Sequence, residues 1–406
     1  MLTRRGWALV TGSVALAAAG RTLGVLELFV LAAGGIGLLV VAVVSVLLQG
    51  RVSLDGARRL VPARAHAGGE ARVELEVRNE GGRPTPVVTL RDQVVPERGG
   101  GTAPARQARF HVAPLAPGES NRAAYRLGAE RRGVFLVGPL EAVVSDPFGL
   151  VSVRSQAAPT TELTVYPRVE VVPPPPRTTG HDPRSGGGHA SHLGSGDEFY
   201  GLRAYEVGDD LRQVHWPSTA RQDDLMIRQQ ELPWQGRSTI LLDVRAGAHT
   251  PESFETAVSV AASVLTACWQ RDSQVRLLTT DGLDSGFGAG PHHLQAAMEH
   301  LAVVGPGPDQ LGSLVAAMRR RPTGALVAVT TSAPAAAAVE RLTATPGFGW
   351  RALVVIARAP GERRPPPPGA VAVRVDPGRS FADAWSRAVA IPSAAAAGPG
   401  PGGPGR

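Results

Sequence analysis

Residues 196–228 hold the side chains of this chain that are best suited to chemistry or recognition. They read GDEFYGLRAYEVGDDLRQVHWPSTARQDDLMIR, which mixes carboxylates, arginines and aromatic rings. Arginine forms paired hydrogen bonds with carboxylates, and tryptophan, tyrosine and arginine are favoured where proteins bind one another. The segment is therefore either an internal polar network or a surface that docks a partner protein. The residues that would serve in either role are Glu198, Arg203, Tyr205, Asp209, Asp210, Arg212, Trp216 and Arg221.

Hydrolysis is the catalytic alternative for this segment, because His215 and Ser218 lie near Asp209 and Asp210. A Ser-His-Asp triad is defined by its geometry, and residues this close in sequence rarely converge in that way. The sequence also lacks a G-x-S-x-G motif, a P-loop and a dinucleotide fingerprint. We therefore expect no catalytic residue, no cofactor and no small-molecule substrate, and we predict that the chain is not an enzyme.

The composition argues against a nucleic acid partner. The chain has 406 residues, enough for two or three domains, and a formal net charge of +7. Its basic residues are arginines scattered along the sequence, without a basic helix or a basic patch interleaved with aromatic rings. The single cysteine, Cys268, falls within an apolar helical pattern and is predicted to be a small core residue.

Two apolar stretches open the sequence, at residues 7–20 and 24–48. The second is long enough for the ~30 Å hydrocarbon core of a bilayer, and the first is short for a full span. A cleaved signal peptide, with residues 17–19 as its cleavage site, is the alternative. The long apolar stretch that follows makes a membrane protein the better prediction.

The arginines around these stretches predict an orientation. Arg4 and Arg5 precede the pair and Arg51 follows it, whereas Arg21 alone lies between the two stretches. We therefore predict two transmembrane helices in residues 1–50. The positive-inside rule then places the soluble domains of this multi-pass cell-membrane protein in the cytoplasm.

Residues 51–170 have the pattern of a β-rich domain. In ARVELEVR, apolar Val73, Leu75 and Val77 alternate with charged residues, which is the period of a half-buried strand. Turns rich in Gly and Pro separate this strand from others, and the whole predicts a small β-sandwich. Further strands are expected at residues 87–90, 123–127, 133–137, 140–144 and 163–166, with a turn at 146–149.

Composition also sets the remaining boundaries. A proline run and a Gly-, Ser- and His-rich stretch make residues 171–195 a linker. The charged and aromatic segment occupies residues 196–236, and an α/β domain occupies residues 237–391. Residues 392–406, rich in Ala, Gly and Pro, are predicted to be a disordered tail.

Strands alternate with helices throughout residues 237–391, beginning with the buried strand STILLDV. Such alternation predicts a mainly parallel, Rossmann-like sheet covered on both faces. Further strands are QVRLLTT, ALVAVTT, ALVVIA and VAVRV. Helices are expected at residues 292–303, 311–320, 335–342 and 380–390, and one more is marked by Phe254, Val258, Ala261, Leu265 and Cys268 at helical spacing.

With these parts in order, the chain resembles the bacterial family of domain-of-unknown-function 58 (DUF58) proteins. GDEFYGLRAYEVGDDLRQVHWPSTAR resembles the family's signature, and RRGVFLVGPLEAVVSDPFGL, residues 131–150, resembles the end of its β-rich region. The order of membrane helices, β region, signature and α/β domain is similar as well. The resemblance implies that the last domain is von Willebrand factor A-like. It also implies a MoxR-type AAA+ ATPase as partner, because proteins resembling this one are often encoded beside such ATPases.

Von Willebrand A-like domains often bind a divalent cation through Asp-x-Ser-x-Ser after the first strand, where hard oxygens suit Mg²⁺ or Mn²⁺. The matching residues here run from Asp243 to Gly247 and read Asp-Val-Arg-Ala-Gly, so both serines are missing. Arg245 also puts a permanent cation where the metal would lie. We therefore expect a degenerate site without metal, in which Asp243 is bonded locally to Arg245.

These observations together predict a non-catalytic, membrane-anchored adaptor or assembly protein that works with a MoxR-type AAA+ ATPase. The alternative is a metal-dependent, ligand-binding receptor of the von Willebrand A type. Intact serines after Asp243 would have favoured that alternative, and Arg245 disfavours it.

Overall fold

The structure is a computed structural model, and it describes residues 2–49, 52–99, 105–176, 199–204, 226–230, 236–310, 314, 318, 324–332, 337–343, 347–358 and 369–390. The chain forms two compact units. The first comprises Met1–Arg168 together with Met298–Gly305, and the second comprises Val169–Ala297 together with Pro306–Arg406.

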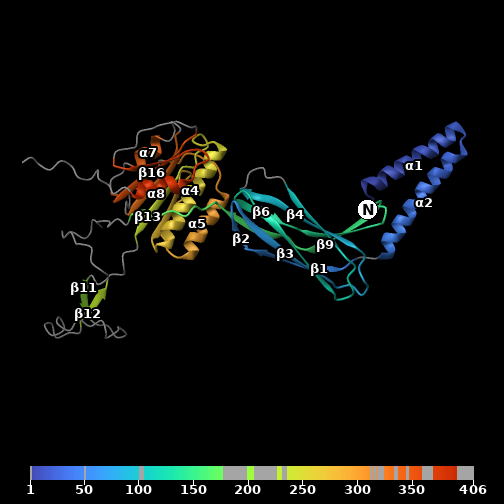
Figure 1. The fold of residues 1–406 in the computed structure, drawn as a ribbon, viewed down its shortest axis with the longest axis horizontal. Coiled ribbons are helices and arrows are strands. Elements are labelled where there is room, and N and C mark those ends of the chain that lie inside the picture. The colour runs from blue at the N-terminus through green and yellow to red at the C-terminus, as the bar shows by residue number, and fades with distance from the viewer. Residues whose placement is uncertain are drawn as a thin grey trace, which may run out of the picture. The chain divides into compact units, whose positions relative to one another are not determined.

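The first unit begins with an antiparallel pair of helices, α1 (Arg4–Leu23) and α2 (Leu26–Gln49) (Figure 1). The hydroxyl of Thr3 caps the start of α1 by accepting a hydrogen bond from the N–H of Gly6. Gly24 ends α1 with φ 68°, and the chain turns back into α2 two residues later.

Small side chains let the two helices approach closely. Ser13 and Gly20 are buried on α1, and Ala32 and Ala42 are buried on α2. Gly35 of α2 lies directly against Ser13, and a Cβ at that position would overlap the serine hydroxyl. Contacts between small residues are typical of helices that pack together within a membrane.

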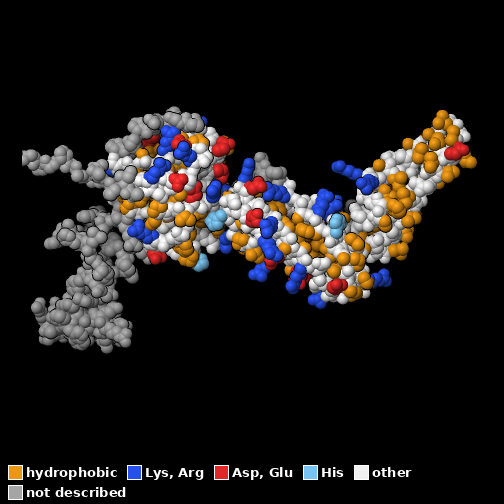
Figure 2. All heavy atoms as spheres, viewed as in Figure 1, with side chains coloured by type: hydrophobic (Ala, Val, Ile, Leu, Met, Phe, Trp, Pro, Cys, Tyr) orange, Lys and Arg blue, Asp and Glu red, His pale blue; other side chains and the backbone are white. Residues whose placement is uncertain are grey.

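Among the helices that the structure describes, only α2 is long and apolar enough to cross a membrane, with a mean hydropathy of 2.7. Figure 2 shows hydrophobic side chains spread over the exposed surface of the helix pair. The sequence predicted two spans. Both helices form, but α1 does not reach the hydropathy of α2, and length and composition therefore support one span.

Two β-sheets follow the helices. One is antiparallel and has the order β1 (Leu54–Val61), β3 (Gly69–Asn79) and β6 (Ser120–Ala129). The other has the order β2 (Arg64–His66), β10 (Thr161–Tyr166), β7 (Gly133–Val137), β4 (Val88–Gly99), β8 (Leu140–Ser145) and β9 (Ser152–Ala158), and β5 (Arg106–Val112) also pairs with β4.

Buried side chains of both sheets form one hydrophobic cluster, as a β-sandwich requires. Val73, Leu75 and Val77 belong to this cluster, so the period of two identified the buried face of β3 correctly. The five other strands predicted in this region all form. Four strands were not predicted: β1, β2, β5 and β9.

A buried ionic group connects the two sheets. Arg58 of β1 forms a two-point ion pair with Asp92 of β4, with Nη2–Oδ1 2.5 Å and Nε–Oδ2 3.2 Å. The hydroxyl of Tyr125 on β6 donates to the same carboxylate at 2.8 Å. Burial, and then the negative charge of Asp92, raise the pKa of Tyr125. Each charge in this group is therefore paired, as burial in a core demands.

The segment at residues 131–150, which resembles a family motif, has structural roles in this unit. The buried guanidinium of Arg132 donates to the carbonyl oxygens of Leu301 and Val304, which belong to the same unit. Gly138 has φ 110°, and a Cβ there would lie 2.8 Å from the guanidinium of Arg58. A larger residue at Gly138 would therefore push against the buried ion pair.

The second unit contains a five-stranded parallel sheet with the order β14-β13-β15-β16-β17. Its described helices alternate with the strands, as the sequence predicted, whereas the helix expected at residues 311–320 lies almost entirely outside the described residues. The strands are β13 (Arg237–Leu242), β14 (Gln274–Thr279), β15 (Ala325–Thr331), β16 (Trp350–Ile356) and β17 (Val371–Val375). Its described helices are α4 (Pro251–Gln270), α5 (Pro291–Val303, which belongs to the first unit from Met298 onward), α7 (Ala337–Thr343) and α8 (Phe381–Ala390). β11 (Phe199–Ala204) pairs with β12 (Met226–Gln230) in a separate two-stranded antiparallel sheet.

Helix α4 packs on the sheet with the apolar face that the helical spacing of its sequence predicted. Its N-terminus has a capping box, in which Thr250 and Ser253 exchange side-chain and backbone hydrogen bonds. The five residues expected on its inner face, Cys268 among them, are all buried. Burial also raises the pKa of the Cys268 thiol to about 11, in keeping with an unreactive core residue.

The close contact between the helices at Gly35 can be tested against its neighbour Gly34, which has open space where a side chain would project. Gly35→Leu is expected to destabilise the helix pair by about 1–3 kcal/mol, the usual cost of overpacking. Gly34→Leu gains the same helix propensity without the collision. Thermal unfolding of both variants in detergent micelles would compare them, and equal midpoints would contradict the described packing.

Candidate functional site

The order of the parallel strands identifies one place where this fold can bind a ligand. The chain passes from β13 to β14 on one side and then crosses to β15 on the other, so the connections reverse direction between β13 and β15. In open α/β sheets, ligands bind outside the carboxyl ends of the strands at such a switch point. Asp243 directly follows β13, and Thr330 lies near the end of β15.

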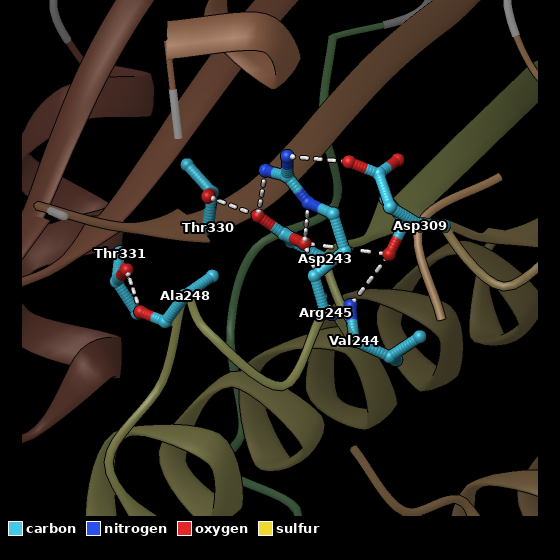
Figure 3. Close-up of polar contacts among 8 residues, drawn as sticks. Asp243, Val244, Arg245, Ala248, Asp309, Thr330 and Thr331 are labelled. Carbon is cyan, nitrogen blue, oxygen red and sulfur yellow. Dashed lines mark hydrogen bonds and ion pairs between the residues drawn. The ribbon is translucent and has the colours of Figure 1, made fainter. Parts of the chain in front are cut away.

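Asp243 is fully buried at this point, and Arg245 fills the space beside it (Figure 3). The Nε and Nη2 atoms of Arg245 donate to the two carboxylate oxygens of Asp243 at 2.9 and 2.8 Å. The arginine side chain is itself only 9% exposed. The sequence predicted that Asp243 would be bonded locally to Arg245, and these hydrogen bonds confirm that prediction.

Hydroxyl groups from two other strand ends complete the surroundings of the carboxylate. Thr330 donates to Oδ2 of Asp243 at 2.7 Å, and Thr280, which follows β14, donates to Oδ1 at 3.3 Å. Thr280 also accepts a hydrogen bond from the N–H of Val244 at 2.8 Å. One carboxylate therefore connects the carboxyl ends of three adjacent strands.

The ionic state of the pair follows from these contacts. Burial alone would raise the pKa of Asp243, but the hydrogen bonds from Arg245 and Thr330 hold it below its ordinary value. The hydrogen bond with Asp243 in turn raises the pKa of Arg245. Asp309 lies on the outer side of the guanidinium, with its Oδ2 3.4 Å from Nη1, and is 56% exposed. The pair is therefore charged throughout the physiological range.

The loop after Asp243 is fixed by backbone contacts. Gly307 donates to the carbonyl oxygen of Val244 at 2.7 Å and accepts from the N–H of Ala246 at 3.2 Å. Thr331 donates to the carbonyl oxygen of Ala248 (Figure 3). Burial lowers the pKa of His249, the next residue, whose ring packs edge-on against Phe254. Gly247 is exposed, and a Cβ built there would have open space around it.

This arrangement has consequences for metal binding. The two carboxylate oxygens of Asp243 accept hydrogen bonds from a guanidinium and two hydroxyls, and a metal ion would have to displace these donors. Within the described ranges, no group of three or more His, Cys, Asp or Glu side chains is arranged to hold a metal ion. The site is thus built as a closed ionic cluster.

The predicted residues of the charged and aromatic segment are mostly not described. Arg203 lies on β11, where it pairs with Ile227 of β12. The remaining candidates lie outside the described residues: Glu198, Tyr205, Asp209, Asp210, Arg212, Trp216 and Arg221, together with His215 and Ser218 of the hydrolytic alternative.

Sequence reasoning missed two members of the cluster, Thr280 and Asp309. A hydroxyl residue directly after a buried strand was the available signal for Thr280, because strand ends of a parallel sheet meet at one edge. Asp309 lies 64 residues beyond Arg245 in an irregular loop, and no sequence signal predicts that contact.

The fold and the site together define a protein with an apolar N-terminal helix, a β domain, and a parallel α/β domain that holds a buried ion pair at the carboxyl ends of its central strands. Residues 201–373 match the family described as protein of unknown function DUF58. This match supports the resemblance to DUF58 proteins that the sequence motifs predicted.

A comparison with curated proteins found no match. Among solved structures, the chain is similar to the CARDB domain of a Pyrococcus furiosus protein in complex with di-metal ions, with 17% identity over 28% of this chain and 93% of that one, and a TM-score of 0.20. A putative ApaA protein from Bordetella pertussis has 14% identity, coverage of 28% and 94%, and a TM-score of 0.21. TM-scores this low carry no argument about fold or function.

Removing the buried cation should have a large effect on stability. Arg245→Ala is expected to lower the free energy of unfolding at neutral pH by about 3–5 kcal/mol, because it leaves the carboxylate of Asp243 buried and unpaired. In the wild type the pKa of Asp243 lies below its ordinary value of 3.8. The pair therefore contributes fully above that value, and its contribution disappears as the pH falls through the folded-state pKa.

Denaturant unfolding of the full chain in micelles, at pH 7 and in acid, measures this difference. Arg374→Ala is a matched control, because Arg374 pairs with Asp376 two residues away at another strand end, but at the surface. It should cost less than about 1 kcal/mol. The assigned role of the pair would be refuted if both variants lost the same free energy of unfolding. It would also be refuted if the free energy lost by Arg245→Ala were the same in acid as at pH 7.

Proposed function

We propose that this protein is a non-catalytic, membrane-anchored adaptor whose α/β domain docks another protein. The observation that carries the proposal is the ion pair at the switch point of the parallel sheet. Asp243, the acid best placed to bind a ligand there, is committed to Arg245 and Thr330. A domain whose ligand position is filled by its own side chains is suited to present a fixed surface rather than to turn over a substrate.

The proposal assigns the α/β domain to a degenerate von Willebrand factor A-like type. Support comes from an acid directly after the first parallel strand and from hydroxyl groups at the end of β15. The departure is Arg245, whose guanidinium takes the position that a serine and a metal ion would share.

The anchor in this proposal is the helix pair, with both α1 and α2 crossing the membrane. The apolar composition of α2 and the contact between Gly35 and Ser13 support two helices packed within a bilayer. The arginines at Arg4 and Arg5 support a cytoplasmic position for the soluble domains by the positive-inside rule.

The partner in this proposal is a MoxR-type AAA+ ATPase, and the docking surface includes the segment at residues 196–236. Support for the partner comes from the family, whose members are often encoded beside such ATPases. Support for the surface comes from the combination of Trp216, Tyr205 and Arg212, residue types that dominate binding energy at protein interfaces.

Affinity purification of the intact protein from its own membranes, followed by mass spectrometry, tests the adaptor function. The wild type should recover the ATPase, and Trp216→Ala and Arg212→Glu should each recover at least tenfold less, which corresponds to about 1.4 kcal/mol of binding free energy. Arg341→Glu changes an exposed arginine on α7 of the same domain and should bind normally. Wild-type membranes that yield no ATPase would remove the partner from the proposal, and unaffected variants would remove the surface.

The receptor alternative makes a different prediction, which calorimetry can examine. A metal ion bound to the folded state raises the unfolding temperature by mass action. Because Arg245 fills the site, the unfolding temperature of the full chain should be the same in millimolar Mg²⁺, in Mn²⁺ and in EDTA. A rise with either metal that is lost in Asp243→Asn would favour the receptor instead.

A further inference from the structure

One end of the β domain is joined directly to the helix pair. The backbone N–H of Thr3 donates to the carbonyl oxygen of Leu150 at 2.9 Å, and its hydroxyl donates to the carbonyl oxygen of Gly149 at 2.6 Å. Leu150 and Val151 also pack against Ala42 and Val46 of α2 in one buried cluster. The turn at residues 146–151 therefore lies beside the start of α1 and the last two turns of α2.

This contact fixes the level of the turn along the helix. Ala42 lies seven residues before the end of α2 at Gln49, which is about 10 Å along the axis at 1.5 Å per residue. The 24 residues of α2 span about 36 Å, a little more than the ~30 Å hydrocarbon core. When α2 is centred in a bilayer, Val46 is about 1–2 Å and Ala42 about 7–8 Å inside the hydrocarbon core, so a turn that packs against them lies among the outermost parts of the acyl chains, next to the headgroups.

The turn itself is rigid and presents an aromatic side chain. Both carboxylate oxygens of the buried Asp146 accept from the N–H of Leu150, at 2.9 and 2.7 Å, and the N–H of Gly149 donates to the carbonyl oxygen of Asp146 at 3.0 Å. These bonds hold the turn closed. Phe148 at its tip is nevertheless 52% exposed, and it is the one aromatic residue among the exposed large hydrophobic side chains of the described β strands and their turns.

Other exposed apolar side chains gather at this end of the domain. Thr89 of β4 pairs with Val143 of β8, so Val87 lies level with Ser145, immediately before the turn. On the other side of the turn, Ser152 of β9 pairs with Ser145, and Val153 is the next residue along β9, opposite Val144. Val87 is 59% exposed and Val153 is 40% exposed.

Basic side chains lie next to this apolar group. Arg4 and Arg5 are exposed at the start of α1, in the residues that follow the Thr3 cap. A Cβ at Gly149 would be 4.0 Å from Nη1 of Arg5, which places that guanidinium over the turn. Exposed apolar side chains flanked by arginines match the surface of a membrane that contains anionic phospholipids.

We propose that the turn at residues 146–151 is a membrane-contact site, in which Phe148, Val87 and Val153 enter the headgroup boundary and Arg5 binds lipid phosphate. This inference rests on the proposed anchor, because the bilayer must surround α2. It adds that the β domain contacts the membrane surface directly, in addition to being attached to the membrane through the helices. An aromatic ring at the headgroup level is also the position that membrane interfaces favour.

Spin-label depth measurements on the full chain in nanodiscs test the proposal. The single native cysteine is buried and is replaced by Cys268→Ala, and labels are attached in turn at Phe148→Cys, Val153→Cys, Val40→Cys and Ala63→Cys. Val40 is exposed within α2 and reports the hydrocarbon core, whereas Ala63 is exposed between β1 and β2, at the far end of β1 from the helices, and reports water. Collision rates with oxygen and with a neutral nickel complex measure the depth of each label.

The labels at Phe148→Cys and Val153→Cys should collide several-fold less with the nickel complex than the label at Ala63→Cys. The difference should grow when anionic phospholipid replaces zwitterionic lipid, and Arg5→Gln should remove that growth. Full water exposure at both turn positions, with the label at Val40→Cys inside the hydrocarbon, would overturn the contact site alone. A label at Val40→Cys that is exposed to water would overturn the anchor as well.

The labelled variants should unfold at the temperature of the Cys268→Ala parent. Labels at two positions of the turn region ensure that the result does not depend on a single substitution that disturbs the structure.

Discussion

The α/β domain is organised around the buried ion pair between Asp243 and Arg245. A carboxylate without solvent must be paired and hydrogen-bonded, and the pair meets this demand by recruiting Thr330 and Thr280 from neighbouring strand ends. The same requirement fixes the loop after β13, because Gly307 must hold Val244 and Ala246 for Arg245 to reach back. The place where open α/β sheets generally bind ligands is therefore occupied here by an ion pair and its hydrogen-bond partners.

The β domain also contains a buried carboxylate that is neutralised by an arginine. Arg58 and Asp92 form a second buried pair, joined by Tyr125, between the two sheets. Arginine suits both positions because its planar fork satisfies two carboxylate oxygens at once and leaves further donors for backbone carbonyls. Arg58 uses those donors on Val137 and Pro159, which ties β1 to the segment around Gly138. The motif at residues 131–150 is thus explained by what it holds in place, without invoking catalysis.

The sequence predicted the parts of the fold that repeat and missed those that depend on distant partners. The alternation around Val73 and the apolar strand STILLDV identified buried strands because burial follows a local period. β1 escaped prediction because its buried Arg58 looks like a surface residue until Asp92 is placed opposite it. The bond from Asp243 to Arg245 could be expected because the two are close in sequence, whereas Asp309 could not. The candidates from Glu198 to Arg221, apart from Arg203 on the backbone of β11, remain predictions outside the described residues.

The contact at residues 146–151 changes what an anchor of this kind would do. A domain attached through a flexible linker samples many heights and orientations, since a linker imposes only a maximum distance. Here the hydrogen bonds from Thr3 and the packing of Leu150 on α2 join the start of one helix and the end of the other to a turn of the β domain. These contacts restrict the orientations that the β domain can take relative to the helix pair. The chain that continues from the β domain towards the α/β domain therefore starts at a restricted height above the bilayer, and this preorganisation is the physical advantage of the arrangement for an adaptor.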